Sequence, residues 1–387
     1  MAKKNSGAAL KVVHLSDLHL GYRRYNRVTK TGFNQREADV NAAFKECVDR
    51  CLNLKPHLIL IAGDLFHSVS PSNSVITFCF KELRRLLQGT GAPIVLVAGN
   101  HETPRRADSG SILALFRELD GVYVADLAPQ RFSFPKLEAS VFCLPHASLV
   151  DMASMQVRAD DKFRYNFLVA HAQVDDTIIS DFGGVNLPLG RLSPHEWDYI
   201  ALGHVHVRRN VALNASYSGS IEHTGTNIWF EAQTAKGFFS IDFPSATKIF
   251  HELTSPREVV VVEPIDAASF GPEQVSEALG QALAKVPGGV GGKIVRVELR
   301  NISRQVFREL DHRQLRRWRA EALNLSLDVK SPLAFGGAAA QHKFTGSLER
   351  ELTDFCAKAE LQYGSIEKIA ALIGGYMKKL EEADEAR

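Results

Sequence analysis

The first half of the chain alternates short apolar runs with longer stretches in which apolar residues recur every three or four positions. Uninterrupted runs rich in β-branched residues predict buried strands, whereas the longer spacing predicts helices with one buried face. The predicted elements are strands at Val12–Leu15, Leu58–Ala62 and Ile94–Ala98 and helices at Arg36–Leu54, Asn73–Leu87 and Ser111–Leu119. Their alternation is typical of a layered α/β domain with a buried, largely parallel sheet.

The apolar runs become shorter and more closely spaced after Val122. They predict strands at Arg131–Phe134, Val141–Leu144, Phe167–Ala170, Tyr199–Leu202, Phe238–Asp242 and Lys248–Leu253. We expect these strands to form a second sheet packed on the first, so that residues 1–255 make one two-sheet α/β domain.

The pattern changes again near Ser255-Pro256. A small α+β domain over residues 256–332 is predicted from a strand at Glu258–Val262, a helix at Pro272–Lys285, a strand at Lys293–Leu299 and two Arg-rich helical stretches. Residues 333–346 are rich in Gly and Ala, and we interpret them as a linker.

Two amphipathic helices are predicted in the last segment, residues 347–387. Their apolar stripes are Leu348, Leu352, Phe355 and Ala359, then Ile366, Ile369, Ile373, Met377 and Leu380. Two short helices cannot bury such stripes alone. We therefore expect this segment to dock on a partner, the alternative being that it folds back on the rest of the chain.

The composition limits the class of protein. With 387 residues, 45% of them hydrophobic and 23% charged, the bulk of the chain is neither disordered nor fibrous. No apolar run approaches the ~20 residues of a membrane helix, and the apolar stretch after Lys3 and Lys4 is too short for a signal peptide. The five cysteines form no CxxC pair, which favours free thiols in a reducing cytoplasm.

Five short polar elements stand just after predicted strands or in the loops that follow them. They are Asp17-Leu-His19-Leu-Gly21, Gly63-Asp64, Gly99-Asn100-His101-Glu102, His171 and Gly203-His204-Val205-His206. Loops at the carboxyl ends of strands are where open α/β sheets build their sites. Each element alone is weak, because a lone histidine on a strand is more often a core residue than a ligand. Together and in this order they favour one shared site.

The residue types in these elements suit a pair of metal ions. Asp17 and His19 point the same way on an extended segment, so both can reach one ion, and the two oxygens of Asp64 can bridge two ions. Asn100 adds a neutral oxygen, and three further histidines add nitrogens. Such a mixed set suits Mn²⁺, Fe or Zn²⁺ better than Ca²⁺ or Mg²⁺. His146 also follows a strand and could face the site, but we favour a loop role for it.

This set resembles the pattern of the calcineurin-like metallophosphoesterase superfamily, DxH, GD, GNH, H and GHxH, over roughly residues 11–250. More narrowly, the chain is similar to SbcD-type DNA repair exonucleases in Leu15-Ser-Asp-Leu-His-Leu-Gly21, Gly63-Asp-Leu-Phe-His-Ser68 and Pro71-Ser72. The resemblance implies an α/β/β/α metallophosphoesterase sandwich at 1–255 and a capping, DNA-binding domain at 256–332.

The resemblance also implies a role for each matching residue. One metal ion would be held by Asp17, His19, Asp64 and His206, and the other by Asp64, Asn100, His171 and His204. The superfamily's preferred ion is Mn²⁺. His101 would stabilise or protonate the leaving oxygen, and His67 would lie beside the DNA phosphate.

Partners are implied as well. Nucleases of the SbcD type act on DNA, in the cytoplasm at the nucleoid, with an SMC-like ATPase of the SbcC type that is gripped by a terminal helix pair. They dimerise through helices in the region of 73–87. In this chain one apolar face suffices to cover the sheet, Ile76, Phe80, Leu83 and Leu87. A second apolar face predicts a homodimer, Val75, Phe78, Cys79 and Leu86.

Basic residues near the motifs favour a nucleic-acid substrate. The loop at 22–30 holds four basic residues, two tyrosines and no acidic residue, and Arg pairs occur at Arg105-Arg106 and Arg208-Arg209. Arginine suits repeated phosphate contacts, although scattered solvated arginines are an ordinary surface feature. Two alternatives to a DNA nuclease stay open. One is a phosphodiesterase on a small nucleotide-type substrate, and the other is a module that recruits the ATPase to DNA.

Overall fold

The computed structural model describes residues 9–104, 110–174 and 186–330. Contacts divide the chain into two units, Met1–Ser331 and Pro332–Arg387. The predicted linker at 333–346, the predicted helices within 347–387 and the Arg105-Arg106 pair lie outside the described residues. Within the described part, no helix is both long enough and apolar enough to cross a membrane.

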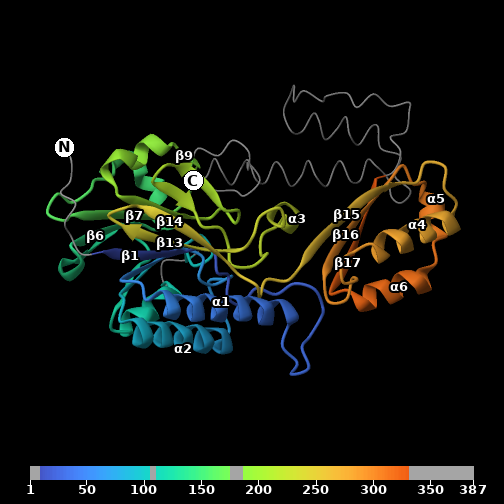
Figure 1. Cartoon of the computed structure of the whole chain (residues 1–387), viewed down its shortest axis with the longest axis horizontal. Coiled ribbons are helices and arrows are strands. Elements are labelled where there is room, and N and C mark those ends of the chain that lie inside the picture. Colours follow the sequence, from blue (N-terminus) through green and yellow to red (C-terminus); the bar gives the residue numbers. More distant parts are fainter. Residues whose placement is uncertain (1–8, 105–109, 175–185, 331–387) are drawn as a thin grey trace, which may run out of the picture. The chain divides into compact units, whose positions relative to one another are not determined.

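Six strands form the first sheet, in the order β14-β13-β1-β2-β3-β4. Figure 1 labels three neighbouring strands of this sheet, β14, β13 and β1. Their bounds are β1 Leu10–Leu15, β2 Leu58–Ala62, β3 Ile94–Val97, β4 Val122–Ala125, β13 Gly237–Phe243 and β14 Thr247–Glu252. β1 to β4 run parallel, while β13 pairs antiparallel with β1 and β14 antiparallel with β13. The expectation that β13 and β14 belong to the second sheet is therefore wrong, because the returning chain pairs with the open edge of β1.

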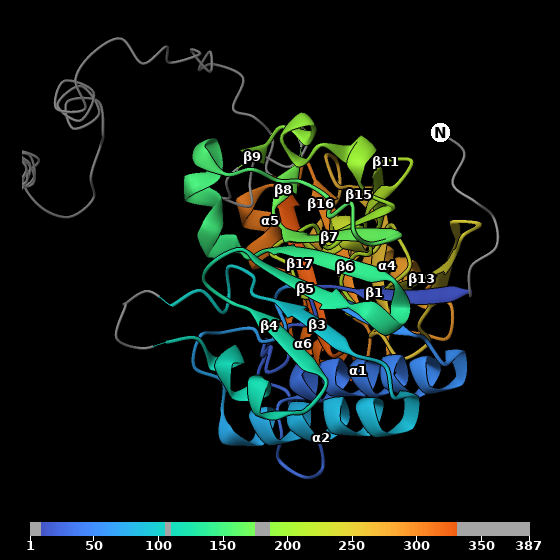
Figure 2. The ribbon, with the colours of Figure 1, turned by 90° about the vertical axis from the view of Figure 1, so that its left-hand side faces the viewer.

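The second sheet has the order β11-β12-β10-β7-β6-β5. Its bounds are β5 Gln130–Phe134, β6 Ala139–Leu144, β7 Tyr165–His171, β10 Tyr199–Gly203, β11 Arg209–Ala212 and β12 Ala215–Tyr217. The four inner strands are parallel, and both edge strands pair antiparallel. Figure 2 shows this sheet above the first, with α1 and α2 below. The layers confirm the predicted two-sheet α/β architecture.

Buried side chains fill each space between the layers. Apolar residues on the facing sides of the two sheets form one core, which includes Leu60, Val97 and Phe167. A second core lies between the first sheet and the helices α1 Gln35–Leu54 and α2 Asn73–Thr90. The outer side of the second sheet is covered by short 3₁₀ helices at His146–Ser154, Leu189–Leu192 and Pro194–Glu196.

The smaller elements complete the sandwich. The predicted helix at Ser111–Leu119 is a 3₁₀ helix at Ile112–Glu118. The others are a 3₁₀ helix at Pro135–Leu137, the strand pair β8 Gln173–Val174 and β9 Asn186–Leu187, and the helix α3 Ile228–Glu231. The long helix α1 begins after Asn34, whose side chain caps it by accepting hydrogen bonds from the next backbone N–H groups.

The face of α2 that turns to the core differs from the prediction. The buried side chains of this helix are Val75, Cys79, Leu83 and Leu86. Ile76 and Phe80, which were expected to cover the sheet, are only partly buried. Both stripes are apolar, so spacing alone could not decide which one faces inward. The partly buried apolar side chains of α2 are Ile76, Phe78, Phe80 and Leu87, and the homodimer stays a prediction.

Residues 259–330 form a third, three-stranded parallel sheet of β15 Val259–Asp266, β16 Ile294–Arg300 and β17 Asn324–Lys330. Its helices are α4 Pro272–Ala284, α5 Arg304–Arg308 and α6 His312–Glu321. These elements enclose their own apolar core, which includes Leu279, Val297 and Leu315. β17 was not predicted. The assignment of residues 256–332 as a capping domain stays a prediction.

Candidate metal centre

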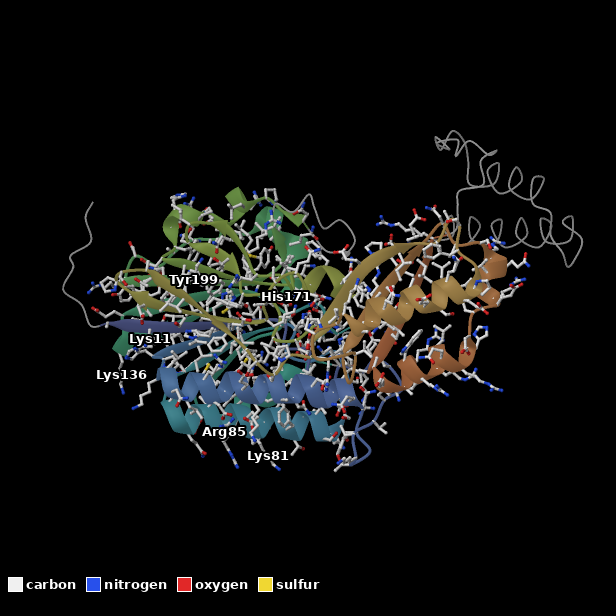
Figure 3. All side chains as sticks on the ribbon, turned by 45° about the vertical axis from the view of Figure 1, so that its right-hand side comes forward. Lys11, Lys81, Arg85, Lys136, His171 and Tyr199 are labelled. Carbon is white, nitrogen blue, oxygen red and sulfur yellow. The ribbon has the colours of Figure 1, made fainter. Side chains whose placement is uncertain are left out.

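The five polar elements of the sequence meet at one edge of the two sheets. β1, β2 and β3 are parallel neighbours in the first sheet, and β7 and β10 are parallel neighbours in the second. Parallel strands end at the same edge, so the loops that follow them lie together. His171 ends β7, whereas Tyr199 begins β10 and lies toward the opposite end of the sheet (Figure 3).

Two glycines permit the close approach of the two sheets at this edge. A Cβ atom at Gly63 would lie 2.1 Å from Nδ1 of His171, and one at Gly203 would lie 1.7 Å from the carbonyl oxygen of Ala62. Only a residue without a side chain fits either position. The glycines of Gly63-Asp64 and Gly203-His204 therefore allow the loops of the two sheets to face each other.

A first group of possible ligand atoms comes from Asp17, His19 and His206, whose ligand atoms lie within 4.8 Å of one another. Nε2 of His19 lies 2.9 Å from Nε2 of His206, which in turn lies 3.9 Å from Oδ1 of Asp17. Two nitrogens bound to one ion at about 2.1 Å each are themselves about 3.0–3.4 Å apart. The observed spacing is close to that of ligands around a shared ion.

A second group lies around the other side of Asp64. Its Oδ2 lies 3.4 Å from Nε2 of His171 and 3.6 Å from Nε2 of His19. Oδ1 of Asn100 lies 3.0 Å from Nε2 of His171 and 3.2 Å from Nδ1 of His204. One carboxylate oxygen thus reaches toward both groups. The seven predicted ligands all take part in these contacts, and their roles as ligands stay predictions.

The donor atoms fit divalent ions. Nδ1 of His171 donates to the carbonyl oxygen of Ala62 at 2.9 Å, so Nε2, which faces Asp64, is the nitrogen at which a metal ion would replace a proton. Nδ1 of His204 lies toward Asn100, while its Nε2 is buried and has no hydrogen-bond partner among the described residues. A buried nitrogen without a partner costs free energy unless something binds it.

Burial and neighbouring charges set the protonation states. Burial opposes ionisation of Asp64, but His171 and the other histidines around it hold its pKa well below the usual range. Burial, and then the charge of His171, lower the pKa of His204 to about 3. Burial disfavours the charged form of His171, yet Asp64 outweighs it and raises its pKa to about 9. Burial likewise disfavours the charged form of His206, yet Glu231 outweighs it and raises the pKa of His206. Protons therefore compete with metal ions at both His171 and His206.

The two predicted catalytic histidines lie beside the first group. Nδ1 of His101 donates to the carbonyl oxygen of His67 at 2.7 Å, and the backbone N–H of His101 donates to Oδ1 of Asp64 at 3.0 Å. Nδ1 of His67 lies 3.3 Å from Nδ1 of His19. His19, His67 and His101 also bring their ligand atoms within 4.8 Å, so a ligand role for His101 needs a direct test.

Two further residues lie at the site, although the sequence analysis gave neither of them a role there. Glu102 is buried and accepts hydrogen bonds from the backbone N–H groups of Phe66 and Gly99, at 2.6 and 2.9 Å, and so ties two motif loops together. Its position next to Asn100-His101 was the only available signal. His146 was expected to have a loop role. Its ring instead lies 6.2 Å from that of His171 and faces the candidate centre.

The basic residues are only partly available to a substrate. Arg27 donates to carbonyl groups at the end of α6, which include Ala322 at 3.2 Å. Arg23 pairs with Glu37 at 2.5 Å. Arg208 lies over the ring of Phe250, 4.1 Å from its centroid. Arg27 thus joins the loop of the first motif to the third sheet's domain, which its sequence context did not indicate.

Comparison with known proteins places the chain in a family. Residues 10–208 match the calcineurin-like phosphoesterases, and the chain belongs to that family. This membership confirms the predicted superfamily and the general class of enzyme, a phosphoesterase.

Named relatives narrow the similarity. The chain is 29% identical over 239 residues to a DNA double-strand break repair protein Mre11 of Methanocaldococcus jannaschii, which covers 60% of this chain and 62% of that protein. It is 26% identical to the Mre11 protein of Methanococcus maripaludis, over 59% of this chain and 62% of that protein. The match thus spans about three fifths of these relatives. A purple acid phosphatase from yellow lupin superposes with a TM-score of 0.40 at 12% identity, over 64% of this chain and 52% of that structure.

Proposed function

We propose that this chain is a Mn²⁺-dependent DNA nuclease of double-strand-break repair, acting as an exonuclease on duplex ends and as an endonuclease near them. One observation carries the proposal: Oδ2 of Asp64 lies 3.4 Å from His171 and 3.6 Å from His19, at the meeting point of both ligand groups. Two divalent ions held there would bind a phosphodiester and supply a hydroxide nucleophile. Similarity to proteins named for DNA break repair supports DNA as the substrate.

The chain's own residues complete the chemistry. The Nδ1–H group of His101 donates a hydrogen bond to the carbonyl oxygen of His67. Nε2 of His101 is therefore the nitrogen that can deliver a proton to the leaving oxygen. The ring of His67 packs edge-on against Tyr22, with ring centroids 4.9 Å apart. This contact holds His67 at the margin of the centre, where a bulky duplex phosphate would meet it.

Partners belong to the same proposal. We propose a homodimer formed through the side of α2 that carries Ile76 and Phe80, both only partly buried in this chain. We also propose that residues 347–387 bind an SMC-like ATPase of the SbcC type, and that the protein works at the nucleoid. The segment 256–332 would act as a capping domain that helps to hold DNA.

The test compares two substrates on the full-length chain. End-labelled duplex DNA and a small chromogenic phosphodiester are each incubated with Mn²⁺, with Mg²⁺ and with a chelator. We expect Mn²⁺-dependent DNA cleavage that the chelator abolishes. His67→Ser should reduce DNA cleavage further than hydrolysis of the small diester, because His67 places the duplex phosphate. Rapid hydrolysis of the small diester with intact DNA would refute the proposal and favour a phosphodiesterase for small nucleotide-type substrates.

A further inference from the structure

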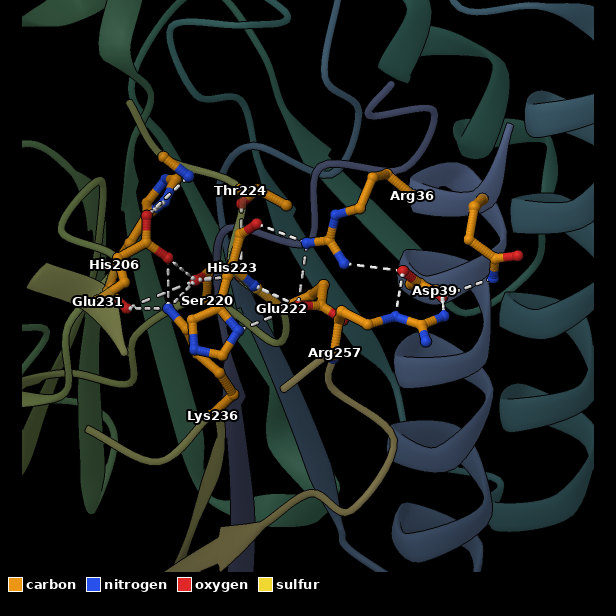
Figure 4. A network of polar contacts seen from close by, with 12 residues as sticks. Arg36, Asp39, His206, Ser220, Glu222, His223, Thr224, Glu231, Lys236 and Arg257 are labelled. Atoms are coloured by element: carbon orange, nitrogen blue, oxygen red, sulfur yellow. Dashed lines mark hydrogen bonds and ion pairs between the residues drawn. The ribbon is translucent and has the colours of Figure 1, made fainter. Parts of the chain in front are cut away.

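The two ring nitrogens of His206 face different surroundings. Nε2 lies 2.9 Å from Nε2 of His19, on the side of the candidate metal centre. Nδ1 lies 3.2 Å from Oε1 of Glu231, on the opposite side (Figure 4). A neutral imidazole carries its proton on one nitrogen only. The partner of Nδ1 therefore decides whether Nε2 has the lone pair that a metal ion needs.

Glu231 is fully engaged and so is not itself a free ligand. It is 2% exposed, and its Oε1 also accepts a hydrogen bond from the backbone N–H of Gly225 at 2.7 Å. Its Oε2 accepts from Nζ of Lys236 at 2.5 Å. Lys236 is also buried, and it donates to Ser220 at 2.7 Å and to the carbonyl oxygen of His206 at 3.0 Å (Figure 4).

The ion pair therefore contacts His206 twice. Glu231 meets the ring, and Lys236 meets the backbone carbonyl of the same residue. A buried ion pair gains little stability over apolar residues of the same size, because both charges lose their hydration. Because both members of this pair contact His206, we infer that the pair serves to position that residue and not to stabilise the fold.

We propose that Glu231 and Lys236 are positioning residues that hold His206 with its proton on Nδ1, so that Nε2 faces the metal centre as a lone pair. This inference rests on the proposed metal-dependent function. The Glu231 carboxylate accepts a hydrogen bond from the Nδ1–H group of His206 and makes the ring a stronger base toward the ion. Loss of such a partner typically weakens metal binding by ~10- to 100-fold. Lys236 fixes the carboxylate and balances its charge.

Direct metal binding tests the inference without DNA. Titration of the full-length chain with Mn²⁺, followed by electron paramagnetic resonance of the free ion, should show two sites. In Glu231→Leu we expect one of the two ions to bind ~10- to 100-fold more weakly, while the other keeps its affinity. Glu231→Gln should lose less Mn²⁺ affinity than Glu231→Leu. The amide oxygen of the glutamine can still accept a hydrogen bond from Nδ1–H of His206, although it carries no charge. Unchanged affinity at both sites in Glu231→Leu would overturn the inference.

Glu222 provides a matched control. It is as buried as Glu231, and it pairs with Arg36 at 3.1 Å and with His223 at 3.2 Å instead of a predicted ligand. Glu222→Gln should therefore lower stability and leave Mn²⁺ affinity unchanged. If Glu222→Gln weakens Mn²⁺ binding as much as Glu231→Gln does, loss of any buried charge is the cause and the inference fails.

A second measurement keeps the inference testable if Glu231→Leu folds poorly. The double variant Glu231→Leu with Lys236→Met removes both charges, so that no lone ammonium is left buried. Nitrogen NMR of the metal-free protein, at a pH high enough for His206 to be neutral, reports which of its ring nitrogens carries the proton. We expect Nδ1 in the wild type and a mixture in the double variant; Nε2 in the wild type would refute the inference. A wild-type chain that binds no Mn²⁺ would refute the proposed function instead.

Discussion

Gly63→Ala adds one methyl group where the two sheets come closest beside the candidate centre. A Cβ atom there would lie 2.1 Å from Nδ1 and 2.8 Å from Cβ of His171, and the backbone φ angle of Gly63 is +92°. Cβ contacts under 3.0 Å are essentially never seen, so the His171 ring must move by about 1 Å. That movement takes Nδ1 away from the carbonyl oxygen of Ala62, which it now meets at 2.9 Å.

The expected cost has three parts. The left-handed backbone costs an alanine about 1–2 kcal/mol. Overpacking of a buried site adds about 1–3 kcal/mol, and the lost hydrogen bond of His171 adds about 1 kcal/mol. We therefore expect Gly63→Ala to lower the free energy of unfolding by about 3–6 kcal/mol. The displaced ring should also weaken Mn²⁺ binding and DNA cleavage.

Gly91→Ala is the matched control. Gly91 also has a positive φ angle, +68°, but a Cβ atom there would meet nothing within 4 Å. It follows α2, before β3 begins, and is thus at the other end of the strands from Gly63. Gly91→Ala should cost only the backbone strain of about 1–2 kcal/mol and leave activity intact.

Urea unfolding and Mn²⁺ titration of both variants decide the question. We expect a larger stability loss and weaker Mn²⁺ binding in Gly63→Ala than in Gly91→Ala. If both variants lose the same stability and bind Mn²⁺ normally, the close contact between Gly63 and His171 does not position the His171 ring.

Four further outcomes test the proposals. Asp64→Ala should lower bound Mn²⁺ at both sites, and elemental analysis finding two ions per chain would contradict a bridging carboxylate. His101→Asn should keep both ions while turnover in single-turnover cleavage falls by ~10²–10⁴, whereas loss of metal would make His101 a ligand. Burial opposes ionisation of Glu222, yet its hydrogen bonds and ion pair lower its pKa from 4.5 to about 2. The ionised carboxylate therefore contributes about 3 kcal/mol of stability at neutral pH. This contribution is lost as the pH falls from 4.5 toward 2. Urea unfolding of Glu222→Gln and wild type should differ less near about pH 3 than at neutral pH, and a constant difference would contradict the lowered pKa. Ile76→Glu should give a monomer in light scattering while Lys81→Glu, on the exposed side of α2, leaves the dimer; a dimer in Ile76→Glu would place the interface elsewhere.

The sequence could predict that the polar loops lie together because its signals are local. Each strand that ends in a ligand loop is a short buried run, as at β2 and β3, and the polar residues follow within a few positions. Parallel pairing then brings those loops to one edge without any further information. Parallel pairing brings Asp64 and Asn100 together, whereas His171 follows a strand of the second sheet and reaches them only because the two sheets pack on each other.

Contacts that depend on the path of a returning segment could not be predicted in the same way. The strand β13 is buried on both faces and pairs with β1, yet nothing in its own residues names that partner. Glu231 follows His206 by 25 positions, in a short helix with no motif around it. The inward stripe of α2 was misassigned because Ile76 and Val75 are equally apolar, and packing, not spacing, decides between them.

Backbone strain at the centre shows how the fold prepares these residues. Asp17, His19, Asp64 and His204 have positive φ angles of 52°, 49°, 50° and 98°. The expectation that Asp17 and His19 lie on an extended segment is therefore wrong, because β1 ends at Leu15 and both residues adopt left-handed backbone. Each such residue costs of order 1–3 kcal/mol and persists only where its surroundings determine it. Backbone hydrogen bonds supply that constraint: the N–H of Asp17 donates to Gly63 at 3.0 Å, and that of His19 donates to Asp64 at 2.9 Å. Folding of the two sheets therefore offsets the free-energy cost of these strained residues. Little of a metal ion's binding free energy is then needed to order the ligands.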